Sequence, residues 1–292
     1  MVNDAAIRLR ERIREDCIPV PGAPFPLAMR LIEAMGFPAA YLSGAAFSAG
    51  QLGLPDIGLF TLTELVQQTE RMTAASSLPL IVDADTGFGE PVNVERTVRQ
   101  LDRAGAAAIQ LEDQVLPKRC GHLSGKSLVT PDAMCAKIRA AVAARGEQGA
   151  VLIARTDARG VEGFDRAIER AEAYIEAGAE WIFVEALESE AEFERVAERI
   201  DVPLVANMTE FGKSPLLRLG ELAEMGYAAV LFPVTLLRIA MRAMEAALGI
   251  IAQEETQQSL LDLMQTREEL YELLDYHDYE ARDQQFFSGG LE

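Results

Sequence analysis

The sequence has few of the residues that mark zinc sites, disulfide scaffolds and redox frameworks. Its 292 residues include only three cysteines and two histidines. Three cysteines in a chain of this length do not form a disulfide framework, which fits free thiols in a reducing, cytoplasmic compartment. The histidines and cysteines also lack the clustered spacing of a zinc site. We therefore expect neither structural zinc nor disulfide bonds.

Positive charge is scarce as well. The chain has 27 lysines and arginines against 46 aspartates and glutamates, a net charge of -19. Because nucleic acids and anionic membranes bind cationic surfaces, we expect neither as a partner. No apolar run reaches the ~20 residues of a membrane helix, and residues 1–15 lack the pattern of a signal or transit peptide. A small anionic substrate is compatible with this charge, since it needs only a few local arginines.

What the sequence does contain is a repeat of short apolar runs, each followed by a polar turn and a helical pattern. The runs are continuous rather than alternating, which indicates strands buried on both faces, as in a parallel sheet covered by helices. Eight such units predict an α/β fold with a single closed (β/α)8 barrel over residues 1–255, with a doubly wound open sheet as the weaker alternative. The predicted strands are 17–20, 40–43, 80–85, 107–112, 150–155, 180–185, 203–207 and 228–233.

Two helices between these strands have readable ends. Periodic apolar residues predict a helix over 164–177, with Gly178 just beyond its C-terminus. A second apolar stripe precedes Gly105, and Asn93 is available as its N-cap.

The C-terminal part of the chain is predicted to be helical. Residues 236–251 and 260–274 have helical patterns, and the second of these is too rich in leucine for a free tail. We expect residues 256–292 to form a helical extension that packs on a neighbouring subunit or on its own barrel.

Polar side chains concentrate where the predicted strands end, the position of active sites in such barrels. Asp83 and Asp85 are two residues apart on one strand, so on an inward face both would converge at the barrel mouth. Either aspartate alone could equally cap a helix or pair with a lysine, but together they favour Mg²⁺, which takes carboxylate oxygens and water. The other polar residues at or beyond strand ends are Ser43, Glu112, Asp113, Arg155, Asp157, Glu185, Asn207 and Arg238.

Residues 117–122, Pro-Lys-Arg-Cys-Gly-His, place one thiol among two cations and an imidazole. Lys118, Arg119 and His122 would favour the thiolate of Cys120, whereas nearby carboxylates would favour the thiol. Such a group can give or take a proton near neutral pH. The alternative is a small buried apolar residue, the commoner state of a free cysteine. The charged neighbours lead us to favour a reactive thiol.

Several motifs, in matching order over almost the whole chain, resemble the isocitrate lyase and phosphoenolpyruvate mutase superfamily. The Lys-Arg-Cys-Gly-His run at 118–122 is similar to its signature, and Val-Asp-Ala-Asp-Thr-Gly-Phe-Gly at 82–89 is similar to its metal-binding strand. The chain lacks the large insertions of isocitrate lyases proper. The segments most similar to the 2-methylisocitrate lyases within this superfamily are 41–44, 53–56, 154–158, 206–212 and 264–267.

This resemblance implies a Mg²⁺-dependent carbon–carbon lyase that cleaves 2-methylisocitrate to pyruvate and succinate. It implies Asp83 and Asp85 as metal ligands, with Asp56 and Glu112 acting through coordinated water. It also implies a homotetramer whose C-terminal helices are exchanged between subunits.

The resemblance also implies roles at the reacting atoms and around the substrate. Cys120 would donate the proton that completes succinate, with Lys118 and His122 beside it, and the initial base stays open between Tyr41 and a metal-linked carboxylate. The implied ligands of the substrate are Ser43, Gly44, Ala45, Cys120, Gly121, Arg155, Glu185, Asn207, Thr209, Arg238 and Arg267.

Other substrates stay open at this point. Residues 123–126 read Leu-Ser-Gly-Lys, where many 2-methylisocitrate lyases have Arg-Pro-Asn-Lys. Related enzymes acting on 2,3-dimethylmalate or oxaloacetate are therefore alternatives. A phosphoenolpyruvate mutase is less favoured, because the cysteine motif is not expected in one.

Overall fold

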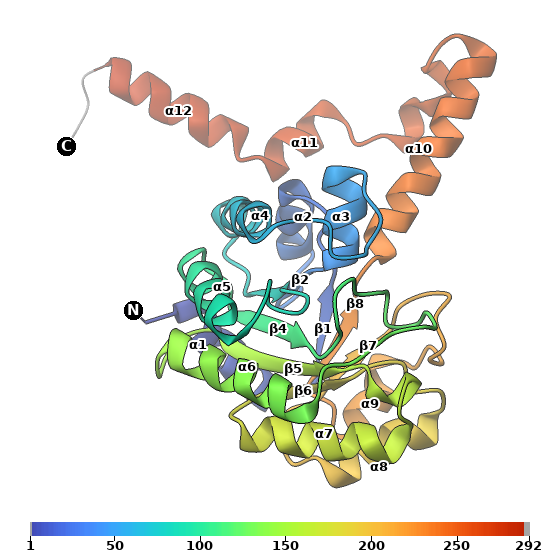
Figure 1. The fold of residues 1–292 in the computed structure, drawn as a ribbon. Coiled ribbons are helices and arrows are strands. Elements are labelled where there is room, and N and C mark those ends of the chain that lie inside the picture. Colours follow the sequence, from blue (N-terminus) through green and yellow to red (C-terminus); the bar gives the residue numbers. More distant parts are fainter. Residues whose placement is uncertain (1, 289–292) are drawn as a thin grey trace. The chain divides into compact units, whose positions relative to one another are not determined.

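The computed structural model describes residues 2–288, and the chain divides into two compact units, Met1–Leu237 and Arg238–Glu292. The first unit holds eight strands, all parallel to their neighbours (Figure 1). Each strand lies within two residues of its predicted bounds, so the strand predictions are confirmed. The strands are β1 Ile18–Pro21, β2 Ala40–Leu42, β3 Leu80–Asp83, β4 Ala108–Glu112, β5 Val151–Thr156, β6 Trp181–Val184, β7 Val205–Asn207 and β8 Ala229–Phe232.

The strands follow one another around a ring. A five-stranded sheet has the order β2-β3-β4-β5-β6, and a three-stranded sheet has the order β1-β8-β7. Parallel bridges from Gly22 to Tyr41 and from Ile182 to Leu204 join the two sheets at both seams. The chain order around the ring is that of a (β/α)8 barrel, and the doubly wound alternative is wrong.

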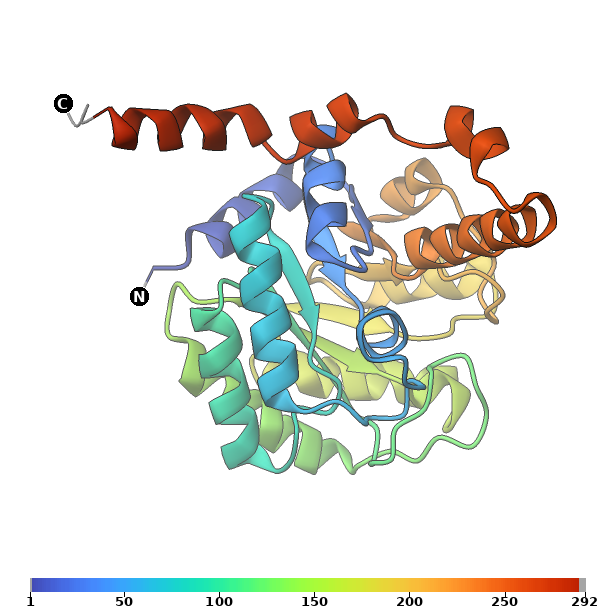
Figure 2. The same ribbon diagram turned by 90° about the horizontal axis from the view of Figure 1, so that it is seen from above.

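Helices of the first unit lie outside the strands (Figure 2). Gly178 follows α7 with a φ of 107°, as its predicted place beyond a helix end requires. The predicted N-cap at Asn93 is wrong, because α5 begins two residues earlier with Pro91 in the first turn after Glu90. The helices are α1 Asp4–Glu15, α2 Pro26–Ala34, α3 Gly44–Leu52, α4 Leu62–Ala75, α5 Pro91–Arg103, α6 Pro131–Arg145, α7 Phe164–Glu176, α8 Glu190–Arg199 and α9 Leu219–Met225.

Alternate residues of the strands fill the barrel interior. Ile81, Ile153, Phe183 and Val205 belong to one buried cluster, whereas their neighbours along each strand pack against the helices in another. Leu9 of α1 is fully buried in the interior cluster together with residues at the starts of strands. Apolar side chains therefore fill the barrel, and polar chemistry is confined to the end where the strands finish.

The second unit is helical. The helix α10 Thr235–Glu254 confirms the prediction for 236–251, but the single helix predicted over 260–274 is wrong. A 3-10 turn, Gln258–Leu263, is followed by α11 Arg267–Leu273 and α12 Tyr276–Phe287. Thr266 starts α11 by forming a reciprocal capping box with Glu269, which separates it from the preceding turn.

The predicted division at residues 255 and 256 stays a prediction, and the compact units of the structure divide after Leu237. Within residues 2–288, no helix combines the length and the apolar character needed to cross a membrane.

Candidate active site

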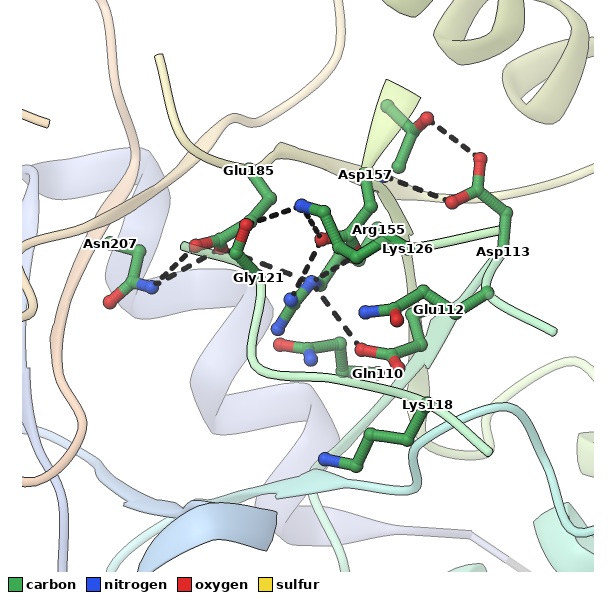
Figure 3. A network of polar contacts seen from close by, with 12 residues as sticks. Gln110, Glu112, Asp113, Lys118, Gly121, Lys126, Arg155, Asp157, Glu185 and Asn207 are labelled. Carbon is green, nitrogen blue, oxygen red and sulfur yellow. Dashed lines mark hydrogen bonds and ion pairs between the residues drawn. The ribbon is translucent and has the colours of Figure 1, made fainter. Parts of the chain in front are cut away.

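The side chains at the ends of the strands continue the inward-facing series of the barrel core. Counting two residues on from the interior apolar positions leads to polar groups on five successive strands, because alternate residues of a strand share one face. Figure 3 shows most of them meeting in one polar network. These inward-facing residues are Asp83, Gln110, Glu112, Arg155, Glu185 and Asn207.

Arg155 lies at the centre of this network. Its Nε is 3.0 Å from Asp157 Oδ2, 3.5 Å from Glu112 Oε2 and 3.8 Å from Glu185 Oε2. The guanidinium also stacks over Phe183, with 5.2 Å from its carbon to the ring centre. Burial alone would lower the pKa of Arg155, but Asp157, Glu185 and Glu112 raise it well above its usual value. Arg155 is thus a permanently charged group at the floor of the site.

Glu185 is ionised for the same reason. Burial would raise its pKa, but Arg155 and then His122 outweigh that effect and lower the pKa to about 2. Asn207 Nδ2 lies 3.2 Å from Glu185 Oε2, and His122 Nε2 lies 2.6 Å from Glu185 Oε1. His122 Nδ1 accepts a hydrogen bond of 2.9 Å from the backbone N–H of Lys213, which fixes the orientation of the ring. Asn207, His122 and Arg155 therefore orient this carboxylate from three sides.

Asp83 and Asp85 approach each other beside Gly44. A Cβ placed on Gly44 would lie 3.1 Å from both Asp83 Oδ2 and Asp85 Oδ1. The predicted convergence is therefore present, but its predicted cause is wrong: β3 ends at Asp83, and Asp85 has a left-handed backbone with φ 47°. Asp83 is fixed on both oxygens by Gly44 N–H at 3.1 Å and by Gln110 Nε2 at 3.2 Å.

Lys118 inserts its ammonium among these carboxylates. Its Nζ lies 2.8 Å from Asp85 Oδ1 and also contacts Asp56. Burial raises the pKa of Asp85 to about 7 even though Lys118 opposes the rise. Burial likewise raises the pKa of Glu112 well above its usual range, and Glu112 Oε1 is buried without a hydrogen-bond partner in the described residues.

This donor set fits Mg²⁺. The Lys118 ammonium pairs with Asp56 and Asp85, and the charges of Asp83 and Glu112 also act on it. A buried oxygen of Glu112 is unsatisfied. Residues 2–288 contain no group of three or more His, Cys, Asp or Glu side chains already placed to hold a metal ion. Mg²⁺ commonly takes one or two protein carboxylates and completes its shell with water and substrate oxygens.

Residues 117–126, here called the cysteine segment, lie against Arg155 and Glu185. A Cβ on Gly121 would come within 2.4 Å of Arg155 Nη2 and of Glu185 Cγ, so only glycine fits at this approach. Cys120 is exposed, and the structure gives its charged neighbours other partners than the thiol. Lys118 and His122, expected beside the sulfur, lie instead against the carboxylates of Asp85 and Glu185.

Tyr41 is part of the site but is badly suited to act as the initial base. Its hydroxyl donates a hydrogen bond to Gln110 Oε1 at 3.1 Å, and Gln110 in turn holds Asp83. Burial, followed by the charge of Asp83, raises the pKa of Tyr41 well above its usual value. A phenol in this setting keeps its proton.

A further buried carboxylate lies just beyond the end of β4, on the side away from the barrel interior. Asp113, which follows Glu112, accepts hydrogen bonds from Thr156 Oγ1 at 2.7 Å, Tyr174 OH at 2.8 Å and the backbone N–H of Asp157 at 2.9 Å. These bonds fasten the ends of β4 and β5 to each other and to α7. They fix the backbone from which Glu112 and Arg155 project inward.

Comparison with known proteins matches this arrangement. A family model described as phosphoenolpyruvate phosphomutase matches residues 16–252. The 2-methylisocitrate lyase of Aeropyrum pernix is 55% identical over 276 residues, which cover 94% of this chain and 89% of that protein. The chain belongs to the phosphoenolpyruvate mutase/isocitrate lyase superfamily.

Two solved structures of superfamily enzymes extend the comparison to the fold. A crystal structure of 2,3-dimethylmalate lyase has a TM-score of 0.91 and 36% identity, covering 100% of this chain and 99% of that one. A phosphonopyruvate hydrolase solved as a complex with oxalate and Mg²⁺ has a TM-score of 0.87 and 28% identity, covering 98% of this chain and 100% of that one. The superfamily therefore includes lyases and hydrolases on this scaffold.

The remaining substrate ligands that the superfamily resemblance implied are divided between the two compact units. Ser43 caps α3, and Gly44 and Ala45 form its first turn next to the aspartates. Thr209 is half-buried in the loop after β7. The two arginines Arg238 and Arg267 belong to the second unit, so their part in a substrate cage stays a prediction.

Three residues of this site had no role assigned from the sequence, although Asp157 was noted among the polar residues near strand ends. Gln110 holds Asp83, and its position two residues before Glu112 on an inward face was the available signal. Asp157 holds Arg155, and Lys126 contacts Asp157. Nothing in local spacing indicates the pairing of Lys126, because it depends on the path of the cysteine segment.

Proposed function

We propose that this protein is a Mg²⁺-dependent lyase that cleaves 2-methylisocitrate to pyruvate and succinate. The observation that carries the choice of substrate is the 55% identity, over 94% of the chain, to an enzyme named 2-methylisocitrate lyase. The geometry supports the reaction class, because a carboxylate-rich corner and a permanently charged Arg155 lie beneath a segment that bears a thiol.

The residues that would hold the ion are Asp83 and Asp85, with Asp56 and Glu112 reaching it through water. A bound divalent cation supplies Lewis acidity, which lowers the pKa of a chelating 2-hydroxy group. Gly44 and Gln110 orient Asp83 for this task through hydrogen bonds of 3.1 and 3.2 Å.

The protein's own groups then act on the bond that breaks. A carboxylate takes the proton of the substrate hydroxyl, the carbon–carbon bond breaks, and its electron pair moves onto the fragment that becomes succinate. Arg155 stabilises the charge that develops there, held in place by Glu185 and Asp157. Cys120 gives its proton to the new carbanion, and pyruvate is the other product. Lys118 and His122 fix both sides of the cysteine segment through Asp85 and Glu185.

We also propose a cytoplasmic homotetramer in which residues 256–292 are exchanged between subunits. Large apolar side chains of this extension are exposed in the single chain, including Leu263 at 81% and Phe287 at 86%. A partner subunit would remove them from water. Light scattering should give four times the mass of the chain for the whole protein and a lower mass after deletion of residues 256–292.

The function is tested by presenting a panel of substrates with Mg²⁺. Racemic 2-methylisocitrate, 2,3-dimethylmalate, isocitrate and oxaloacetate are each incubated with the enzyme, and the products are followed by NMR. We expect kcat/KM for 2-methylisocitrate to exceed that for the others by at least about tenfold. Preference for 2,3-dimethylmalate, the substrate named for a structural relative with a TM-score of 0.91, would replace the proposed substrate and retain the reaction class.

The metal assignment is tested without turnover. Mn²⁺ binding, measured by electron paramagnetic resonance, should be lost in Asp85→Asn and kept in the control Asp165→Asn, whose side chain is 83% exposed. Equal Mn²⁺ binding by both variants would remove Asp85 from the ligand set.

A further inference from the structure

Lys126 is a buried cation that the proposed chemistry does not use. Its side chain is 2% exposed, and its Nζ lies 2.8 Å from Asp157 Oδ1, whose side chain is fully buried. The same ammonium donates to the backbone carbonyl of Gly121, five residues earlier in the chain. Lys126 therefore ties the cysteine segment to itself and to the wall of the barrel.

Asp157 is a firm anchor for this contact. Its Oδ2 accepts from Arg155 Nε at 3.0 Å, its Oδ1 accepts from Arg155 Nη2 at 3.2 Å, and its backbone N–H is held by Asp113. One carboxylate thus bonds the guanidinium of the site on one side and the ammonium of the cysteine segment on the other. Because Lys126 and Arg155 share the Asp157 carboxylate, a shift of Lys126 would also move a hydrogen-bond partner of Arg155.

We propose that Lys126 is a positioning residue that latches the cysteine segment over Arg155, and that Asp157 sets the segment and the guanidinium in register. The proposal deepens the proposed function, on which it rests for the role of Cys120. Gly121 is the point of contact, since its missing side chain lets the backbone approach Arg155 and Glu185. With the latch closed, Cys120 is held one residue from that contact. Loss of the ammonium would free the segment while leaving Arg155 paired with Asp157.

The test is hydrogen exchange of the substrate-free protein. In Lys126→Met, deuterium uptake over residues 119–125 should be at least about tenfold faster than in the wild type, with uptake over β5 unchanged. The matched control is Arg10→Met. Arg10 also bonds one carboxylate, Glu180, at 2.9 Å and one backbone carbonyl, that of Gly149, at 3.0 Å, but it belongs to α1 at the opposite end of the barrel. It should leave uptake over 119–125 at the wild-type rate.

Turnover provides the second reading. With 2-methylisocitrate, kcat of Lys126→Met should fall at least about tenfold while KM changes less, since the latch places the thiol rather than the substrate. If Lys126→Met does not fold, Lys126→Gln, which keeps a donor but not the charge, is measured instead.

The two proposals fail in different ways. Faster exchange without lyase activity in the wild type would leave the latch standing and overturn the proposed function. Exchange over 119–125 within about twofold of the wild type in a folded variant would overturn the latch, whatever the activity.

Discussion

Replacing Gly121 by alanine adds one methyl group at the closest approach between the cysteine segment and the site. That group would lie 2.4 Å from both Arg155 Nη2 and Glu185 Cγ, so the segment must move roughly 1 Å to restore ordinary contact. Movement breaks two bonds made by charged groups, between His122 and Glu185 and between Lys126 and the carbonyl of Gly121. At about 1.5–3 kcal/mol each, the closed arrangement loses about 3–6 kcal/mol.

A loss of that size lowers the ratio of closed to open segment by roughly 10²–10⁴, and the closed population falls nearly as far when the two forms are close to balance in the wild type. We therefore expect kcat for 2-methylisocitrate to fall at least about 100-fold in Gly121→Ala. The free energy of unfolding in urea should change by less than about 1 kcal/mol, because the segment is peripheral to the core. Gly220→Ala is the control, since a Cβ there meets nothing within 4 Å. Turnover of Gly121→Ala within about threefold of the wild type would refute the close approach.

Three further predictions concern pH and stability. The pKa of Glu185, lowered to about 2 by Arg155 against the effect of burial, means that its ion pairs stabilise the fold above the unfolded value near 4.5. The difference in unfolding free energy between wild type and Glu185→Gln should therefore shrink as pH falls from about 4.5 toward about 2, and a constant difference would contradict this. Leu9→Ala should cost about 2–5 kcal/mol in urea without changing KM, and a loss below about 1 kcal/mol would show that α1 does not fill the barrel interior. Tyr174→Phe removes a 2.8 Å hydrogen bond to buried Asp113 and should cost about 1–3 kcal/mol, whereas an unchanged melting temperature would assign that bond no role.

The barrel could be predicted because its strands are buried on both faces. Runs such as residues 150–154 are continuous in apolar residues, a pattern that a half-exposed strand does not have. Their number and the helical spacing between them then leave few architectures. The site followed from the fold, since polar residues such as Arg155 and Glu185 come directly where these runs end.

Contacts between loops could not be predicted from local sequence patterns, because they depend on the tertiary path of each loop. The left-handed backbone of Asp85 is a tertiary feature, because an extended residue there would point its carboxylate elsewhere. The partners of Lys118 and Lys126 depend on how the cysteine segment folds back across the barrel. Their charges were visible in the sequence, but their placement against carboxylates rather than the thiol was not.

Two errors could have been avoided from the sequence itself. Pro91 favours the first turn of a helix, so α5 was bound to start before Asn93. Thr266 and Glu269 have the spacing of a capping box, which marks a helix start inside the stretch we expected to be continuous. In both cases apolar periodicity was given more weight than the signals at helix ends.

The consecutive residues Glu112 and Asp113, at the end of β4, place their side chains on opposite sides of the barrel wall. Asp113 and its hydroxyl and amide partners secure the frame from behind, out of reach of any substrate. In the proposed function, Glu112 and the other inward groups provide the metal and substrate contacts on the opposite side. Because the hydrogen bonds of Asp113 hold the strand ends from outside the barrel, inward side chains can be replaced without loss of these bonds. New reactions can therefore arise on the same scaffold. A superfamily that contains both lyases and hydrolases is what such a division permits.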